Sequence, residues 1–237
     1  MDTKQKFDLW VDKVMAYAAE AGPRIGRHVA AMQSKPFFDR QSDILFLGIN
    51  PAEEGSYSSG SAADARGRFY VGNCFPPEVW HNRWDWVFNP ESPDNAFAKA
   101  GWGEAVRPGR YLFFNVVFFG SPHGGTDIAA YNDIIHHCVG FSAEAITDIF
   151  RPRCVICFSV PKVFDRLNSV MHFDNVQRIE RIMRADGTPM VHRVMSGEKD
   201  GIRFYGIPHF TGYWRVTKAD FDAIVAAIHE DLLRTLR

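Results

Sequence analysis

The stretch Asp43-Ile-Leu-Phe-Leu-Gly-Ile49, directly followed by Asn50-Pro51, is the clearest fold signal in the sequence. It is continuously apolar rather than alternating, which is typical of a strand buried on both faces of a parallel sheet. Three further runs share this character: Tyr111–Phe114, Cys154–Phe158 and Ile202–Ile207. The gaps between the four runs exceed the roughly twelve residues that a parallel crossover needs. We therefore predict an α/β fold, a three-layer α/β/α sandwich around a central, mainly parallel four-stranded sheet.

The segments between these runs carry helical patterns. We expect an N-terminal helix over about residues 3–21, closed by Gly22-Pro23, and a final helix opened by the capping box Thr217-Lys-Ala-Asp220. Three more helices are expected to begin near Thr126, Ser142 and Ser159, because these hydroxyl side chains can cap the apolar patterns that follow.

Two segments do not fit simple strand–helix units. Residues 52–75 are rich in Gly, Ser and Ala, and we expect a long loop there. Residues 172–200 predict a hairpin-like insertion that turns at Asp186-Gly187. With no internal repeat and no linker, the interpretation is a single domain over residues 1–237.

Composition narrows the possible functions. The chain has 237 residues, of which 46% are hydrophobic and 23% charged, so we expect an ordered globular protein. The formal net charge is −1, and any affinity for nucleic acid must come from a local basic patch. The polar N-terminus and the lack of a long apolar stretch lead us to expect a cytoplasmic protein without a membrane partner.

The four cysteines do not predict a metal site or a disulfide scaffold. Cys154 and Cys157 form a C-x-x-C within a predicted strand, where residues three apart point to opposite faces. The adjacent pair His136-His137 lies on a predicted helix, where neighbours diverge by about 100°. We therefore expect neither a metal nor another cofactor.

Polar side chains directly follow three of the predicted strands. The first strand leads into Gly48-Ile-Asn50-Pro51, the second into Asn115, and the fourth into Pro208-His209. Alone, each Asn is usually a turn former and a His is usually structural. In open parallel sheets, however, ligands bind beyond the carboxyl ends of the strands. Two amides and an imidazole that meet there can satisfy the hydrogen-bonding edge of a planar heterocycle.

These motifs, in this order, resemble the uracil-DNA glycosylase superfamily, nearest its mismatch-specific/thymine and single-strand-selective monofunctional branches. Gly48-Ile-Asn-Pro51 resembles the first motif, Leu112-Phe-Phe-Asn115 the middle strand, and Gly206-Ile-Pro-His209-Phe the second motif. The similarity covers about residue 40 to the C-terminus. It departs from the family in Ala52-Glu-Glu-Gly55 after the first motif and in the inverted order of Pro208-His209.

The resemblance implies a monofunctional DNA N-glycosylase that flips a base into a pocket and hydrolyses its glycosidic bond. It implies that Asn50 positions the attacking water and that His209 donates to the departing base. Asn115 would bind the pyrimidine edge, with Gly48, Ile49 and Pro51 around the site. Phe75, within Gly72-Asn-Cys-Phe75, would stack on the flipped ring, although Phe69 and Tyr70 are rivals.

The segment after the second motif is expected to contact DNA. Phe210, Tyr213 and Trp214 can act as a wedge in the space that the base leaves, and Arg215 and Lys218 can bind phosphates. Arg66 and Arg68, beside the long loop, are further phosphate candidates. Core packing of Phe210 or Trp214, and ordinary solvated charges for the basic residues, are equally good interpretations.

The expected partner is DNA that contains uracil or a related damaged base, bound by a monomer. Two other functions remain open: a nucleic-acid-binding module of the same fold without activity, and a hydrolase of small nucleosides. The sequence contains no Gly-x-Gly-x-x-Gly, no P-loop and no Gly-x-Ser-x-Gly, so dinucleotide, nucleoside-triphosphate and α/β-hydrolase chemistry have no motif support.

Overall fold

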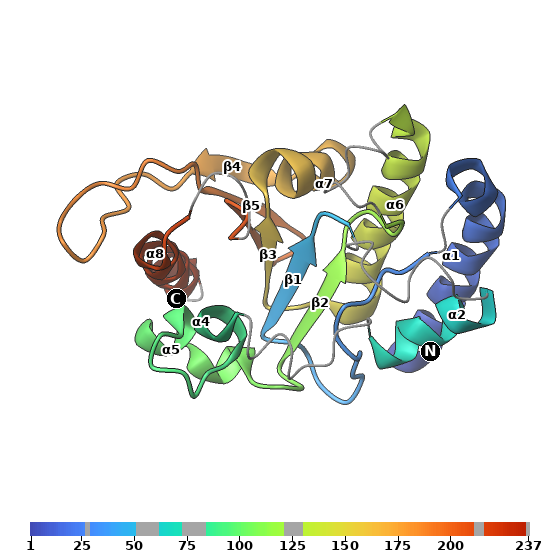
Figure 1. Cartoon of the computed structure of the whole chain (residues 1–237), viewed down its shortest axis with the longest axis horizontal. Helices are drawn as coiled ribbons and strands as arrows, with labels where there is room; N and C mark the ends of the chain where they lie inside the picture. The colour runs from blue at the N-terminus through green and yellow to red at the C-terminus, as the bar shows by residue number, and fades with distance from the viewer. Residues whose placement is uncertain (27–28, 51–61, 73–83, 121–129, 211–215, 236–237) are drawn as a thin grey trace.

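A computed structural model describes residues 1–26, 29–50, 62–72, 84–120, 130–210 and 216–235 of the chain (Figure 1). Its centre is one six-stranded mixed sheet flanked by helices. The strands are β1 (Ile44–Gly48), β2 (Tyr111–Asn115), β3 (Cys154–Phe158), β4 (Asp174–Arg178), β5 (Met195–Lys199) and β6 (Ile202–Ile207). All four predicted strands are confirmed, as β1, β2, β3 and β6.

The strand order across the sheet is β2-β1-β3-β6-β5-β4. The pairs β2–β1, β1–β3 and β3–β6 are parallel, whereas β6–β5 and β5–β4 are antiparallel. The expectation of four strands was therefore wrong. The predicted insertion at residues 172–200 supplies β4 and β5, because a short turn at Asp200-Gly201 lets β5 pair directly with β6.

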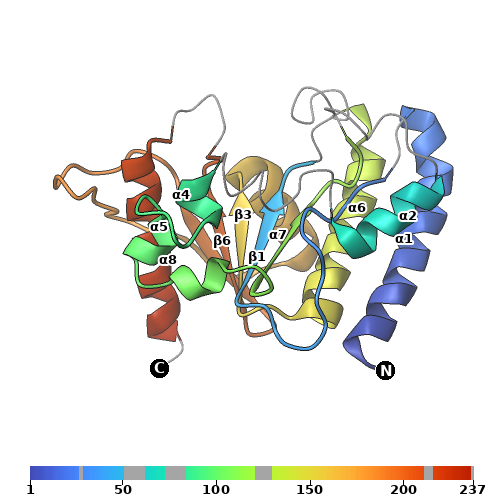
Figure 2. The same cartoon turned by 60° about the horizontal axis from the view of Figure 1, so that its bottom comes forward.

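Helices cover both faces of the sheet (Figure 2). On one face, a hydrophobic cluster combines alternate strand residues such as Leu47 and Phe114 with helices of that side. These helices are α1 (Thr3–Ile25), α6 (Asn132–Glu144) and α7 (Asp165–Met171), with π-helical turns at Ala145–Phe150 (η3) and Val160–Phe164 (η4). The helix α2 (Ala62–Val71) contributes Phe69 to the same cluster.

A second cluster fills the opposite face and includes Phe46, Phe113 and Phe158. It is covered by α4 (Asp85–Phe88), α5 (Ala96–Lys99), the 3₁₀ turn η1 (Gly103–Val106) and α8 (Lys218–Thr235). Cys154 belongs to this second cluster and Cys157 to the first, so the predicted divergence of the C-x-x-C thiols is confirmed. Burial raises the pKa of both thiols.

Some predicted helix boundaries were wrong for identifiable reasons. The first helix continues through Pro23 and ends only at Gly26, whose left-handed φ of 64° suits a glycine. Ser142 does not start a helix, because it lies inside α6 and its hydroxyl donates to the carbonyl of Cys138. The expected loop 52–75 contains α2. The cap expected at Thr126 lies outside the described residues.

Other boundaries are confirmed. The hydroxyl of Ser159 accepts a hydrogen bond from the amide of Lys162 as η4 begins. At the start of α8 the amide of Asp220 donates to the Thr217 hydroxyl and the amide of Thr217 donates to the Asp220 carboxylate, which are the two bonds of a capping box. The insertion turns at Asp186-Gly187, where Gly187 has a φ of 79°. No helix within the described ranges combines the length and the apolar character needed to cross a bilayer.

Candidate functional site

The carboxyl ends of β1 and β2 bring the first two predicted motifs together. Gly48 and Asn115 are paired in the parallel register, and the pairing continues when Val116 donates to the carbonyl of Gly48 and Val117 to that of Ile49. Asn50 follows one residue later. Gly48, Ile49, Asn50 and Asn115 therefore lie at one edge of the sheet, as the sequence predicted.

The side chain of Asn115 lies across Gly48. A Cβ atom at position 48 would overlap the Oδ1 atom of Asn115 and would lie 3.3 Å from Cε2 of Phe113. The missing side chain of Gly48 is thus what allows the amide to extend from β2 over β1. Because β3 is the next strand beyond β1, the amide extends toward the middle of the sheet.

The Asn115 amide has an unused donor. Asn115 is only 3% exposed, yet its Nδ2 atom makes no hydrogen bond to any residue that the structure describes. Leaving such a donor buried without a partner costs about 1–3 kcal/mol. Most buried polar groups in folded proteins are paired, so an exception at a strand end indicates a place where a ligand oxygen can accept a hydrogen bond.

Aromatic rings line the same face of the sheet next to this amide. Phe158, the last residue of β3, stacks on Phe46 with ring centroids 5.4 Å apart and an interplanar angle of 3°. It also contacts Phe113 edge to face at 5.9 Å. By the strand register, Phe46 and Phe113 lie two residues below Gly48 and Asn115, and Phe158 lies level with that pair. The three rings form an apolar surface beside the amide.

His209 follows β6 and lies beyond Phe158. Its ring centroid is 6.1 Å from that of Phe158 and 5.3 Å from that of Phe210, on which it stacks. Burial, and secondarily the positive charge of Lys162, lowers the pKa of His209 from 6.5 to about 4. The imidazole is therefore neutral at pH 7 and offers one N–H donor and one acceptor. The sequence placed His209 at this edge, and the structure agrees.

Ser159 also belongs to this edge, although the sequence analysis recognised it only as a helix cap. It directly follows β3, between the ends of β1 and β6, and is 8% exposed. Its φ of 123° is unusual for a residue with a side chain, and its amide donates to the carbonyl of Ile207. Strained backbone of this kind is frequent at binding sites. Only its position at a strand end signalled it in the sequence.

The structure corrects the role expected of Phe210. This residue is only 8% exposed and packs against Phe158 at 4.8 Å, Trp84 at 5.6 Å and Trp86 at 5.8 Å. It is therefore a core residue and not an exposed DNA wedge. Its position after a strand suggested an exposed loop, but its ring is buried against three other aromatic rings. The core interpretation is the correct one.

Other candidates have structural partners. Lys218 pairs with Asp94 at 2.6 Å on the surface, which leaves its ammonium exposed but already engaged. Arg66 pairs with Asp12 of α1 in the same way. Such exposed pairs are worth little energy and exchange readily for another anion.

Phe69 and Tyr70, the alternatives to Phe75 for stacking on the base, both have structural roles. Phe69 is 1% exposed and packs edge to face on Trp10, and the Tyr70 hydroxyl donates to Asp8. Both belong to the cluster on the face opposite Phe158, so neither is placed to stack on a ring there. Pro51, Phe75, Tyr213, Trp214 and Arg215 lie outside the described residues.

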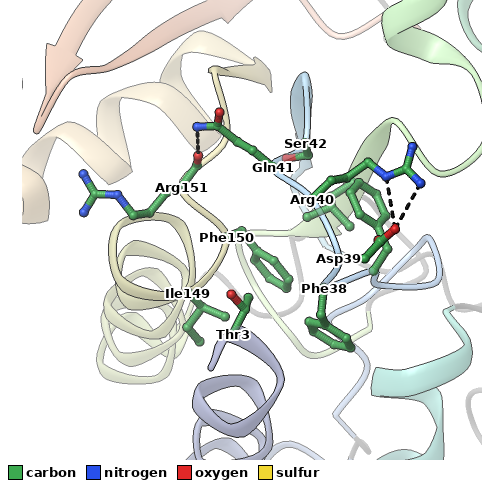
Figure 3. A pocket seen from close by; sticks show the side chains of 11 residues that line it. Thr3, Phe38, Asp39, Arg40, Gln41, Ser42, Ile149, Phe150 and Arg151 are labelled. Carbon is green, nitrogen blue, oxygen red and sulfur yellow. Dashed lines mark hydrogen bonds and ion pairs between the residues drawn. The ribbon is translucent and has the colours of Figure 1, made fainter. Parts of the chain in front are cut away.

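A separate cavity of about 340 Å³ opens at the amino ends of the strands (Figure 3). It lies between the start of α1, the segment that leads into β1 and the end of η3, and its lining includes Phe38, Arg40, Ser42 and Phe150. None of the predicted site residues lines it. Among the described residues, no group of three His, Cys, Asp or Glu side chains could hold a metal ion.

In comparisons with known proteins, no family model matches this chain, and no curated protein matches it significantly.

Proposed function

We propose that this protein is a monofunctional DNA N-glycosylase that releases uracil or a related damaged base. The observation that carries the proposal is the buried Asn115 amide at the carboxyl ends of the parallel strands. Its Oδ1 lies over Gly48, and its Nδ2 has no hydrogen-bond partner among the described residues. A pyrimidine oxygen is an acceptor that fits this donor. A mixed sheet with helices on both faces is compatible with the α/β fold that the sequence predicts.

The chemistry requires a positioned water and a hydrogen-bond donor at this edge. Asn50 holds the attacking water, which adds to C1′ of the sugar as the bond to the base breaks. An amide is a weak base, so Asn50 positions the water and contributes little to its deprotonation. His209, neutral at pH 7, donates its N–H to the base oxygen that gains negative charge.

The order Pro208-His209 differs from the family motif but is compatible with this role. β6 ends at Ile207, and the backbone carbonyl of Ile207 is held by the amide of Ser159. This bond fixes the point from which the chain leads to His209. The imidazole is then restrained by its stack on Phe210. Packing therefore sets its position, whatever the order of Pro208 and His209 in the motif.

Base release from synthetic DNA tests the proposal. The purified chain, in EDTA, is expected to release uracil from single- or double-stranded oligonucleotides with one deoxyuridine. Asn50→Ala and Asn115→Asp are each expected to lower the single-turnover rate by about 100-fold or more, since positioned water and oriented donors are each worth factors of this size. Asn115→Asp keeps the shape of the side chain and removes the N–H donor.

The matched control is Asn175→Asp, the same change at an exposed residue of β4. It should release uracil at the wild-type rate. Intact substrate at high excess of wild-type protein would contradict the proposal. Salt-sensitive DNA binding without release would instead support the binding module without activity.

A further inference from the structure

Between β4 and β5 the chain forms a projecting two-stranded ribbon, residues 179–194 (Figure 1). Its strands are held by bonds from the amide of Ile179 to the carbonyl of Val194 and from the amide of Met190 to the carbonyl of Ile182. Near the tip, Met183 and Pro189 form an antiparallel bridge. The register at Ile182–Met190 and Met183–Pro189 is shifted by one residue from that of β4 and β5, and within this outer part alternate residues point to two distinct faces.

The inner face packs on the protein. Ile182 is 6% exposed and Met190 is 8% exposed, and both belong to the cluster that contains Phe210. The outer face has the opposite character. Continuing the register places Arg181 opposite Val191, next to the pair Met183–Pro189. All four are exposed, and Val191 reaches 78%.

A buried ion pair attaches the ribbon to the start of α8. Nε of Arg184 donates to Oδ1 of Asp220 at 2.6 Å, and Asp220 is 2% exposed. The other carboxylate oxygen of Asp220 accepts from the amide and hydroxyl of Thr217. The ribbon is thus attached to the start of α8. This helix begins at Lys218, nine residues after His209 in the chain.

The charge of the ribbon favours an anionic partner. Residues 179–194 contain three arginines, Arg181, Arg184 and Arg193, and two acidic residues, Glu180 and Asp186. Arg184 pairs with Asp220 and Arg193 lies 4.0 Å from Asp165, so Arg181 is the cation that the outer face presents. The whole chain has a net charge of −1, so this local excess is a departure from the average. Arg181 is exposed and makes no ion pair with any residue that the structure describes.

We propose that the outer face of the ribbon contacts a groove of DNA that flanks the excision site. A two-stranded ribbon fits a DNA groove, and proteins that bind the minor groove combine arginine with apolar side chains such as Met and Pro. Arg181 would contribute charge, and Met183, Pro189 and Val191 would contribute apolar contact. The position beside an excision site rests on the proposed function, whereas DNA contact by the ribbon does not.

Two ribbon variants, each with a matched control, test the proposal in the full chain. Arg181→Glu is compared with Arg40→Glu, the same charge change at the opposite edge of the sheet (Figure 3). The double variant Met183→Ser/Val191→Ser is compared with Leu9→Ser/Leu233→Ser, which alters side chains that are 50% and 47% exposed elsewhere. Circular dichroism melts verify that all four fold.

Fluorescence anisotropy with a 30-base-pair duplex containing an abasic-site analogue measures binding. Arg181→Glu is expected to weaken binding about tenfold and to reduce the slope of log K against log salt by about 1. The apolar double variant is expected to weaken binding about fivefold with an unchanged salt slope, because it removes no charge. The two controls should change binding less than about twofold. Uracil release from a five-nucleotide single strand, too short to reach the ribbon, should be the same in all variants.

Each contrary result has a distinct meaning. Ribbon variants that bind the duplex like their controls would overturn the proposal, even if uracil release succeeds. Slower release from the short strand by the ribbon variants would also overturn it, since the ribbon would then act in the site itself. Sedimentation that shows a dimer dissociated by the apolar variant, with unchanged DNA binding, would make the face a contact between copies. Weakened duplex binding without any wild-type uracil release would uphold the ribbon and refute the glycosylase.

Discussion

At the scale of single residues, the missing side chain of Gly48 determines where the Asn115 amide can lie. Gly48 is the last residue of β1, and glycine in a strand usually weakens packing. Here the absent Cβ makes room for the Asn115 amide on the neighbouring strand. The glycine therefore serves a close approach of two strands and not a turn, since its backbone is ordinary extended strand.

Gly48→Ala is expected to displace the Asn115 amide and to destabilise the protein by about 1–3 kcal/mol, as overpacking of a core does. Uracil release should fall by at least about tenfold. The control is Gly140→Ala in α6, where a Cβ meets no atom within 4 Å. That change should stabilise the protein by about 0.5–1 kcal/mol and leave release unchanged. Urea unfolding and single-turnover release measure both; unaltered release in Gly48→Ala would refute the role of the amide.

His209 links stability to pH because its pKa is lower in the folded protein than in the unfolded chain. The folded-state pKa is about 4, against 6.5 for an ordinary histidine. Between these values the unfolded chain binds a proton that the folded protein does not. Stability is therefore fully present above about pH 6.5 and decreases as the pH falls toward 4.

Comparison of wild type with His209→Gln isolates this effect. Between pH 7 and pH 5 the wild type should lose about 2 kcal/mol more unfolding free energy than the variant, from about 1.4 kcal/mol for each pH unit in this window. Guanidinium unfolding at the two pH values measures the difference. Equal losses in both proteins would show that His209 titrates normally and is not held neutral.

At the scale of elements, a buried polar network joins β6 to α8. Oδ2 of Asp231 accepts from Nη2 of Arg203 at 2.9 Å, from Nε of Arg203 at 3.2 Å and from the Tyr205 hydroxyl at 2.9 Å. Arg203 is 7% exposed, so its charge depends on this one carboxylate for most of its compensation. The network fixes α8 to the sheet. The segment that connects His209 to α8 is therefore held at its far end.

Asp231→Ala should destabilise the protein by about 3–5 kcal/mol, because it leaves a buried guanidinium without its main partner. A matched control is Glu230→Ala, which removes the neighbouring carboxylate of an exposed pair with Arg234 and should cost less than about 1 kcal/mol. Thermal and urea unfolding measure both variants. Similar costs for the two would mean that the network contributes little.

At the scale of the whole molecule, one sheet separates two hydrophobic clusters, and each strand of its parallel part contributes to both. The candidate site and the cavity of Figure 3 lie at opposite edges of this sheet. The acidic and basic residues nearly cancel over the chain, yet the ribbon has an excess of arginine. A near-neutral protein can therefore still present a local surface suited to DNA.

The sequence by itself predicted the four parallel strands, the last helix and the placement of Asn50, Asn115 and His209 at the carboxyl ends of β1, β2 and β6. Continuous apolar runs, capping residues and strand ends are local patterns, and their physical consequences hold whatever the surroundings. The hydroxyl of Ser142 looked like a helix start because capping residues also occur within helices, where they bond to the preceding turn.

Only the tertiary structure decided that Gly48 accommodates the Asn115 amide, that Phe210 is core and that the insertion extends the sheet as β4 and β5. Each depends on contacts between residues distant in the chain. Whether an aromatic residue is buried, or an amide left without a partner, is set by what the fold packs against it.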